Sequence, residues 1–110
     1  MMAVPTQEKV AALIRDFGSA HLAELLGVGP AHVERWQRDE AIDAISAERI
    51  DLLEVVMAHL LRLYSIEAAQ RWLVGLNPHL GDRRPIDLIL RRQIHGVLAA
   101  IANERAGSSA

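Results

Sequence analysis

Apolar residues recur at spacings of three and four along almost the whole chain, and this spacing is typical of α-helices that bury one face. Near the start, Val10, Leu13, Ile14 and Phe17 follow it. No stretch of useful length alternates polar and apolar residues as a half-buried strand does. The chain has 110 residues, of which 51% are hydrophobic and none is cysteine. We therefore expect an all-α protein without disulfides or thiolate metal sites, either one compact unit or two small subdomains that share a core.

Glycine, proline and small polar residues divide this pattern into separate helices. Thr6, Ser19, Ser46 and Ser65 stand where N-caps are expected, since their short side chains accept hydrogen bonds from the first helical turn. Glycines end the first two helices, and a proline begins the third. The expected helices cover residues 6–16, 19–26, 30–38, 46–64, 65–74, 85–90 and 93–105, with a loop over 39–45 and a frayed tail over 106–110.

The long helix over 46–64 carries apolar residues on two flanks. A helix that is apolar on two flanks is buried on both, so we expect it to connect an N-terminal helical part to a C-terminal one. The two flanks are Leu53, Met57, Leu60 and Tyr64 on one side, and Leu52, Val56 and Leu63 on the other.

Residues 19–38 read SAHLAELLGVGPAHVERWQR and fit a helix-turn-helix. Ala23 is small where two helices would cross, and Gly27 stands where the turn needs a left-handed backbone. Leu22, Leu26, Val28, Val33 and Trp36 are the apolar residues expected to lock the pair together. The pattern resembles the Xre/Cro-type helix-turn-helix, whose second helix enters the major groove of DNA. Gly29 departs from the Ser or Thr usual at that position.

By this resemblance, the outward residues of the second helix would contact DNA. Arg35 and Arg38 suit phosphate or guanine, and Gln37 suits adenine or phosphate. The expected DNA-binding residues are His32, Glu34, Arg35, Gln37 and Arg38. Residues 1–50 nevertheless hold five basic and eight acidic side chains, whereas residues 51–110 hold seven arginines and six acids. An acidic N-terminal half opposes phosphates, so a helix-turn-helix that serves only packing is the competing interpretation.

The segment from Ser65 to Ile89 reads SIEAAQRWLVGLNPHLGDRRPIDLI. Leu76 and Leu80 alternate with turn residues, so we expect both to anchor a packed loop. The segment resembles the toxin-binding domain of the MbcA/ParS/Xre antitoxins, whose signature is a Trp-Leu helix, Asn-Pro, a Leu-Gly turn and Arg-Pro-x-Asp-Leu. The residues that carry the resemblance are Trp72, Leu73, Asn77, Pro78, Leu80, Gly81, Arg84, Pro85, Asp87 and Leu88.

The resemblance implies a bacterial protein that inhibits another protein. We expect it in the cytoplasm, because the absence of cysteine fits a reducing compartment and the first residues lack the basic and apolar regions of a signal peptide. In that family the C-terminal domain clamps a toxin of the RES type, an NAD-consuming enzyme, and the final helix covers the mouth of its NAD pocket. Arginines flanking the expected helix over 85–90 suit carboxylates of such a partner, and the end of the last helix would reach the toxin's active site. The expected toxin-binding residues are Arg83, Arg84, Arg91, Arg92, Asn103, Glu104 and Arg105.

Several residues of the C-terminal part also have a simpler, structural interpretation. Asn77 and Asp87 are expected to hydrogen-bond within the loop and the helix start, and Trp72 to lie in the core. The arginines could form a solvated face. On the last helix, Ile94, Val97, Leu98 and Ile101 are expected to pack inward, and Ala99, Ala100 and Ala102 to form shallow flanks open to a partner.

The sequence argues against an enzyme. No two of the five histidines are three or four residues apart, no glycine-rich phosphate loop is present, and no serine has the surroundings of a nucleophile. No apolar run is long enough to span a bilayer. We expect no cofactor, no metal, no small-molecule substrate and no membrane association.

The leading hypothesis is therefore a type II antitoxin, and we expect a homodimer because operator readers of this type bind paired half-sites. Its expected domains are a helix-turn-helix unit over 1–45, a connecting helix over 46–64 and a toxin-binding domain over 65–110. One alternative is a DNA-binding regulator whose C-terminal domain only dimerises. Another is a toxin-binding module whose N-terminal unit never contacts DNA.

Overall fold

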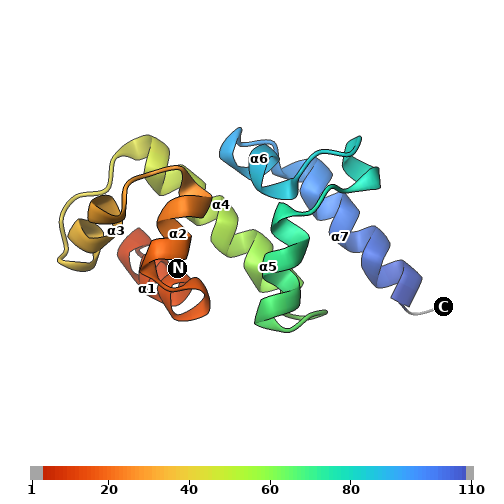
Figure 1. Ribbon diagram of the computed structural model, residues 1–110, viewed down its shortest axis with the longest axis horizontal. Helices are drawn as coiled ribbons and strands as arrows, with labels where there is room; N and C mark the ends of the chain where they lie inside the picture. Colours follow the sequence, from red (N-terminus) through yellow and green to blue (C-terminus); the bar gives the residue numbers. More distant parts are fainter. Residues whose placement is uncertain (1–3, 109–110) are drawn as a thin grey trace. The chain divides into compact units, whose positions relative to one another are not determined.

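The structure, a computed structural model, describes residues 4–108 (Figure 1). These residues form an all-α protein, as the apolar spacing predicts, and within them the only β-type pairing is an isolated bridge between Asn77 and Arg83. The helices are α1 (Thr6–Phe17), α2 (Ser19–Leu26), α3 (Pro30–Gln37), α4 (Ala44–Leu60), α5 (Ile66–Val74), the short 3₁₀ helix η1 (Pro78–Leu80), α6 (Pro85–Leu90) and α7 (Ile94–Ser108).

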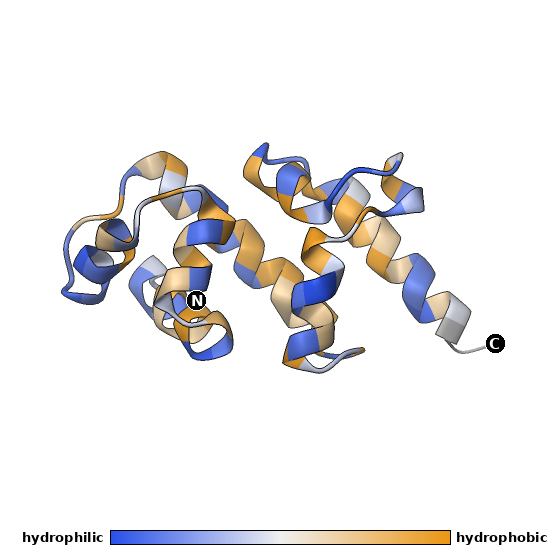
Figure 2. Ribbon diagram, viewed as in Figure 1, coloured by the Kyte–Doolittle hydropathy of each residue, from blue (hydrophilic) through white to orange (hydrophobic). Residues whose placement is uncertain are grey.

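The chain divides into two compact units, Met1–Glu54 and Val55–Ala110, which we term the N-terminal and the C-terminal unit. In the N-terminal unit α1, α2 and α3 pack against one another. In the C-terminal unit α6 packs against α5 and α7, and η1 packs against α7. Hydrophobic and hydrophilic residues are interleaved along the helices (Figure 2), and the packing of the helices buries hydrophobic residues in both units. The boundary between the units falls inside α4, so both units include part of this helix.

In the N-terminal unit two glycines end helices as expected. Gly18 ends α1 with a φ of 82°, and Gly27 ends α2 with a φ of 70°, in the left-handed region. A side chain at Gly27 would cost about 1–2 kcal/mol in this conformation, so the tight connection from α2 to α3 depends on glycine. The buried core of the three helices comprises Val10, Leu13, Phe17, Leu22, Ala23, Leu25, Leu26, Val33 and Trp36.

Two of the expected N-caps of this unit are wrong. Thr6 is the first residue of α1, Pro5 occupies the cap position, and the Thr6 hydroxyl donates to Asp51 Oδ1 on α4 at 3.3 Å. Ser19 is likewise the first helical residue, because Gly18 occupies the cap position of α2 without a side-chain hydrogen bond. In both places the preceding residue already has the non-helical backbone that a cap requires.

The N-cap of α4 is Asp43 rather than Ser46. The helix begins two residues earlier than expected, at Ala44, and the backbone N–H of Ser46 donates to Asp43 Oδ2 at 3.0 Å. Ser46 is the third helical residue and is buried. A carboxylate at the cap accepts this bond more strongly than a hydroxyl would, since the acceptor is charged.

Helix α4 ends at Leu60, not at Tyr64, and residues 61–63 continue in tighter turns. Its buried residues form one stripe, and only part of the second flank is covered, because Leu52 and Leu63 are half-buried. The buried stripe comprises Ile50, Leu53, Val56, Met57 and Leu60.

Within the described residues, every helix is too short or too polar to reach across a bilayer.

In the C-terminal unit the expected helix starts are confirmed. The Ser65 hydroxyl caps α5 by accepting from the Ala68 backbone N–H at 3.2 Å, and Pro85 begins α6. Helix α7 runs past Arg105, so residues 106–108 of the expected frayed tail are helical, and 109–110 lie outside the described residues. The core of this unit comprises Ala69, Leu73, Leu80, Ile86, Leu88, Ile89, Val97, Ala100 and Ile101.

Replacing Asp43 with alanine is expected to lower the free energy of unfolding by about 1 kcal/mol, because α4 loses its cap. Asp43→Asn, which keeps an acceptor, should remain within about 0.5 kcal/mol of the wild type. In the wild type, the hydrogen bonds of Asp43 with Ser46 lower the pKa of Asp43. The stabilisation that its carboxylate provides is therefore present above about pH 4 and is lost as the pH falls through the lowered pKa. Denaturant unfolding at pH 7 and at acid pH measures both effects. An alanine variant as stable as the asparagine variant would contradict the capping role.

Candidate protein-binding surface

The hydrogen bonds of the loop between α5 and α6 converge on one buried residue, Asn77. Its Oδ1 accepts from the backbone N–H of His79 at 2.9 Å, and its backbone carbonyl accepts from Leu80 and Asp82 at 3.0 and 2.9 Å. Its own N–H donates to the carbonyl of Arg83 at 3.1 Å. Because four polar groups converge on one residue, the loop has a defined shape. Asn77 is thus a local hydrogen-bonding residue, as expected.

Only one of the two expected loop anchors is buried. Leu80 is 4% exposed and packs inside the unit, whereas Leu76 is 71% exposed. The exposure of Leu76 has a backbone cause. Gly75 and Asn77 both have extended backbones, and neighbouring residues of an extended segment point to opposite sides. Asn77 points inward, so Leu76 points outward. Leu76 and Val74, which is 41% exposed, thus form an apolar surface on the ordered loop and at the end of α5.

A pocket of ≈ 370 Å³ opens between α5, this loop and α7. Tyr64, Arg71, Trp72, Leu76 and Glu104 are among the residues that line it. Trp72, expected in the core, is only half-buried. Its indole Nε1 is buried and, among the described residues, it has no hydrogen-bond partner. An unpaired buried donor costs about 1–3 kcal/mol. We term this site the α5–α7 pocket.

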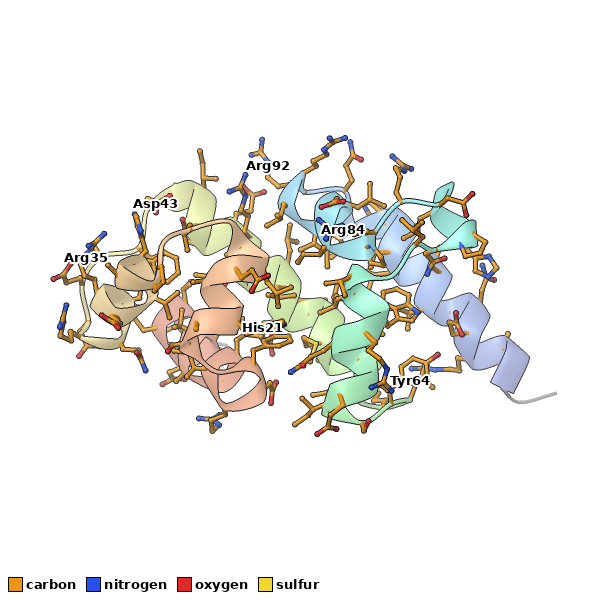
Figure 3. All side chains as sticks on the ribbon, viewed as in Figure 1. His21, Arg35, Asp43, Tyr64, Arg84 and Arg92 are labelled. Atoms are coloured by element: carbon orange, nitrogen blue, oxygen red, sulfur yellow. The ribbon has the colours of Figure 1, made fainter. Side chains whose placement is uncertain are left out.

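Glu104 is fixed at the wall of this pocket by Tyr64. The phenol hydroxyl of Tyr64, which lies between α5 and the last turns of α7 (Figure 3), donates to Glu104 Oε2 at 3.0 Å. Burial, and then the hydrogen bond and the negative charge of Glu104, raise the pKa of Tyr64. Tyr64 therefore remains a protonated donor at neutral pH. The contact joins residues 40 positions apart in the sequence, and no local pattern in the sequence indicates it.

The four arginines around α6 are not equivalent. Arg84 binds Asp87 through two hydrogen bonds of 3.0 and 2.8 Å, which lower the pKa of Asp87 and raise that of Arg84. This confirms Asp87 as a local partner at the helix start. Arg83 donates from Nε to the carbonyl of Leu80 at 2.8 Å. The side chains of Arg84 and Asp87 are both exposed, so their ion pair adds little stability.

Arg91 and Arg92 follow α6 directly and are exposed. Arg92 has a φ of 63°, a left-handed conformation that is uncommon for a residue other than glycine. The conformation ends α6 and turns the chain into α7. Figure 3 shows Arg84 and Arg92 at the same end of the C-terminal unit, around α6. The arginines thus form an exposed basic rim whose members differ in how many of their hydrogen-bond donors are already engaged.

The last helix presents less of its alanine face than expected. Ala99 and Ala102 are exposed, but Ala100 is 1% exposed and belongs to the core. Val97 and Ile101 are buried as expected, whereas Ile94 and Leu98 are half-buried. Near the end of α7, Asn103 and Arg105 are exposed and Glu104 is half-buried.

On α3 and at its C-cap, Arg38, four of the five residues expected to contact DNA are exposed, namely His32, Glu34, Gln37 and Arg38. The fifth, Arg35, is half-buried, and its Nε lies 3.6 Å from Glu40 Oε2. The N-terminal unit carries five basic and ten acidic side chains, a formal charge of −5, whereas the C-terminal unit carries seven basic and four acidic ones, a charge of +3.

Comparison with models of known protein families, with curated proteins and with solved structures found no match to this chain. Within residues 4–108, no three His, Asp or Glu side chains come together as a metal-binding group. The functional interpretation therefore depends on the residues themselves, and on the resemblance that the segment from Ser65 to Ile89 carries.

Replacing Asn77 with alanine is expected to lower the free energy of unfolding by about 1–2 kcal/mol, because the backbone N–H of His79 loses its buried acceptor. It should also speed hydrogen exchange at the His79 amide, which NMR measures residue by residue. Leu76→Ala is the matched control in the neighbouring position. Because Leu76 is exposed, its replacement should change stability by less than about 0.5 kcal/mol. Equal effects of the two substitutions would contradict the role assigned to Asn77.

Proposed function

We propose that this protein is the antitoxin of a type II toxin–antitoxin system. It would bind a RES-type, NAD-consuming toxin and block the entrance to its active site, without carrying out chemistry itself. The proposal starts from the resemblance of residues 65–89 to the toxin-binding domain of the MbcA/ParS/Xre antitoxins.

One structural observation carries the proposal further. Leu76 is the most exposed of the large apolar side chains in the described residues, and it stands on a loop fixed by the hydrogen bonds of Asn77. Apolar side chains that are exposed on an ordered loop beside a pocket are typical of protein-binding surfaces. An ordered surface also binds at a lower entropic cost than a loop that must first be ordered.

The charged residues around this surface suit a protein partner. Arg91 and Arg92, with Arg83 and Arg84, would face carboxylates of the toxin, since guanidinium groups bind carboxylates in a planar, bidentate way. Asn103, Glu104 and Arg105 stand near the end of α7, where a helix end would reach the mouth of the toxin's NAD pocket.

The second part of the proposal is operator binding by a helix-turn-helix made of α2 and α3. The left-handed backbone of Gly27 between the helices supports it, as do the exposed side chains on α3 and at its C-cap, namely His32, Glu34, Gln37 and Arg38. The charge of −5 on the N-terminal unit weighs against it. A homodimer would present two such helices to paired half-sites. The competing proposals are a regulator whose C-terminal unit only dimerises, and a toxin-binding protein that never contacts DNA.

Replacing Leu76 with glutamate is expected to weaken toxin binding at least about ten-fold, because a charge would be buried in an apolar contact. Co-purification and growth rescue, after co-expression with a RES-type toxin, measure the effect. Ile45→Glu is the matched control, since Ile45 is an apolar residue of the N-terminal unit that is 58% exposed, and it should leave binding unchanged. If the wild type neither co-purifies with the toxin nor rescues growth, the antitoxin proposal is wrong.

Replacing Arg38 with alanine is expected to weaken binding to the upstream DNA and to reduce the salt dependence of binding, the slope of log K against log salt, by about 1. Arg35→Ala should have a smaller effect, because Arg35 already lies near Glu40. Arg62→Ala removes an exposed arginine of the C-terminal unit and serves as the control. A gel-shift titration at several salt concentrations provides the measurement. No shift by the wild type at low salt would leave the toxin-binding module as the surviving proposal.

A further inference from the structure

We propose that the α5–α7 pocket receives a cationic side chain, an arginine or a lysine, from the partner protein, with Glu104 as its counter-ion. This inference rests on the proposed function for the identity of the partner, the toxin. The pocket itself is defined by residues of the C-terminal unit alone.

The first reason is that the carboxylate of the α5–α7 pocket, that of Glu104, is already held in place before a partner binds. Glu104 is half-buried, and the hydroxyl of Tyr64 holds Oε2 at 3.0 Å. An ionised carboxylate has two oxygens and accepts about four hydrogen bonds, so Glu104 retains acceptor capacity after binding Tyr64. A carboxylate that is already fixed and partly removed from water attracts a cation more strongly than a mobile, solvated one, because the surroundings screen it less.

The second reason is the chemistry of the walls. Trp72 and Tyr64 contribute aromatic rings and Leu76 contributes an exposed apolar side chain. Arginine and lysine have long apolar stems that pack on such surfaces while the charged group reaches a counter-ion. Aromatic faces also attract cations directly. Apolar walls around a single carboxylate therefore fit a side chain that is apolar along its length and positive at its end.

One residue of the pocket opposes this inference and makes it testable. Arg71 lines the same pocket, and its positive charge would repel an incoming cation. Unlike Glu104, Arg71 is exposed, so water and salt screen its charge more effectively. The balance therefore favours a cation. Substitutions at Glu104 and at Arg71 must have opposite effects, which no merely apolar pocket would produce.

The direct test is titration of the full-length protein with N-acetyl-arginine amide, whose only charge is its guanidinium group. The indole N–H signal of Trp72 in an NMR spectrum reports binding, and that of Trp36, which is buried in the N-terminal unit, is the internal reference. The Trp72 signal is expected to shift in a saturable way while the Trp36 signal remains fixed. N-acetyl-glutamate amide and N-acetyl-leucine amide, the acidic and neutral probes, should bind at least about five-fold more weakly.

Three substitutions then test the roles of charge and shape. Glu104→Gln, which preserves size, should weaken binding of the arginine probe at least about five-fold, and Arg71→Gln should strengthen it. Tyr64→Phe, which keeps the ring but frees Glu104, should weaken binding by less than Glu104→Gln. Circular dichroism confirms that the variants fold. Stronger binding of the acidic probe, or no effect of Glu104→Gln on the arginine probe, would overturn the inference.

The toxin gives a second and separable readout. If the toxin binds the wild type and Glu104→Gln weakens the complex about five-fold or more, the pocket is used in the complex. If the toxin binds both proteins equally, the pocket inference fails while the antitoxin proposal stands. If the wild type binds the arginine probe but not the toxin, the proposed function fails and the cation-binding pocket remains.

Discussion

Where the chain passes from α5 to α6 it must reverse without regular structure, and its backbone polar groups still need partners. Asn77 supplies them. Its side chain and both of its backbone groups bind within the loop, to His79, Leu80, Asp82 and Arg83. The position of every exposed residue nearby follows from this arrangement. Leu76 faces outward because Asn77 faces inward, and η1 places Leu80 against α7. The exposed apolar part of the surface proposed to bind the toxin therefore depends on the side-chain and backbone hydrogen bonds of one buried residue.

The two units have opposite formal charges, −5 and +3. This partition matters for the two halves of the proposed function. The C-terminal unit carries a basic rim around α6, which suits an acidic protein surface, together with one fixed carboxylate in a pocket on α5 and α7. The N-terminal unit has few cations for phosphates, and one of them, Arg35, already lies near an acid. On electrostatic grounds the proposed toxin binding is thus better supported than the proposed DNA binding.

The sequence predicts the all-α class and most helix limits, because these depend on local features. Ser65, Pro85 and Gly27 lie where capping and turn rules place them. The errors arise where two local signals compete. Asp43 and Ser46 both suit an N-cap of α4, and the charged acceptor takes the position.

The candidate site is harder to predict, because side-chain direction and distant contacts decide it. A leucine among turn residues suggests an anchor, but the backbone of its neighbours determines that Leu76 points outward. The hydrogen bond between Tyr64 and Glu104 joins α7 to the segment before α5. It has no sequence signal at all.

Glu54 and Val55, at which the units meet, are consecutive residues of α4. No loop is available there to be lengthened, cut or exchanged. Severing the chain at that point would divide the buried stripe of α4, leaving Ile50 and Leu53 with one fragment and Val56, Met57 and Leu60 with the other. Each fragment would carry, at the cut, a short helical segment with exposed apolar residues. The chain is thus expected to tolerate a cut or an insertion better near its termini than at the boundary between the two units.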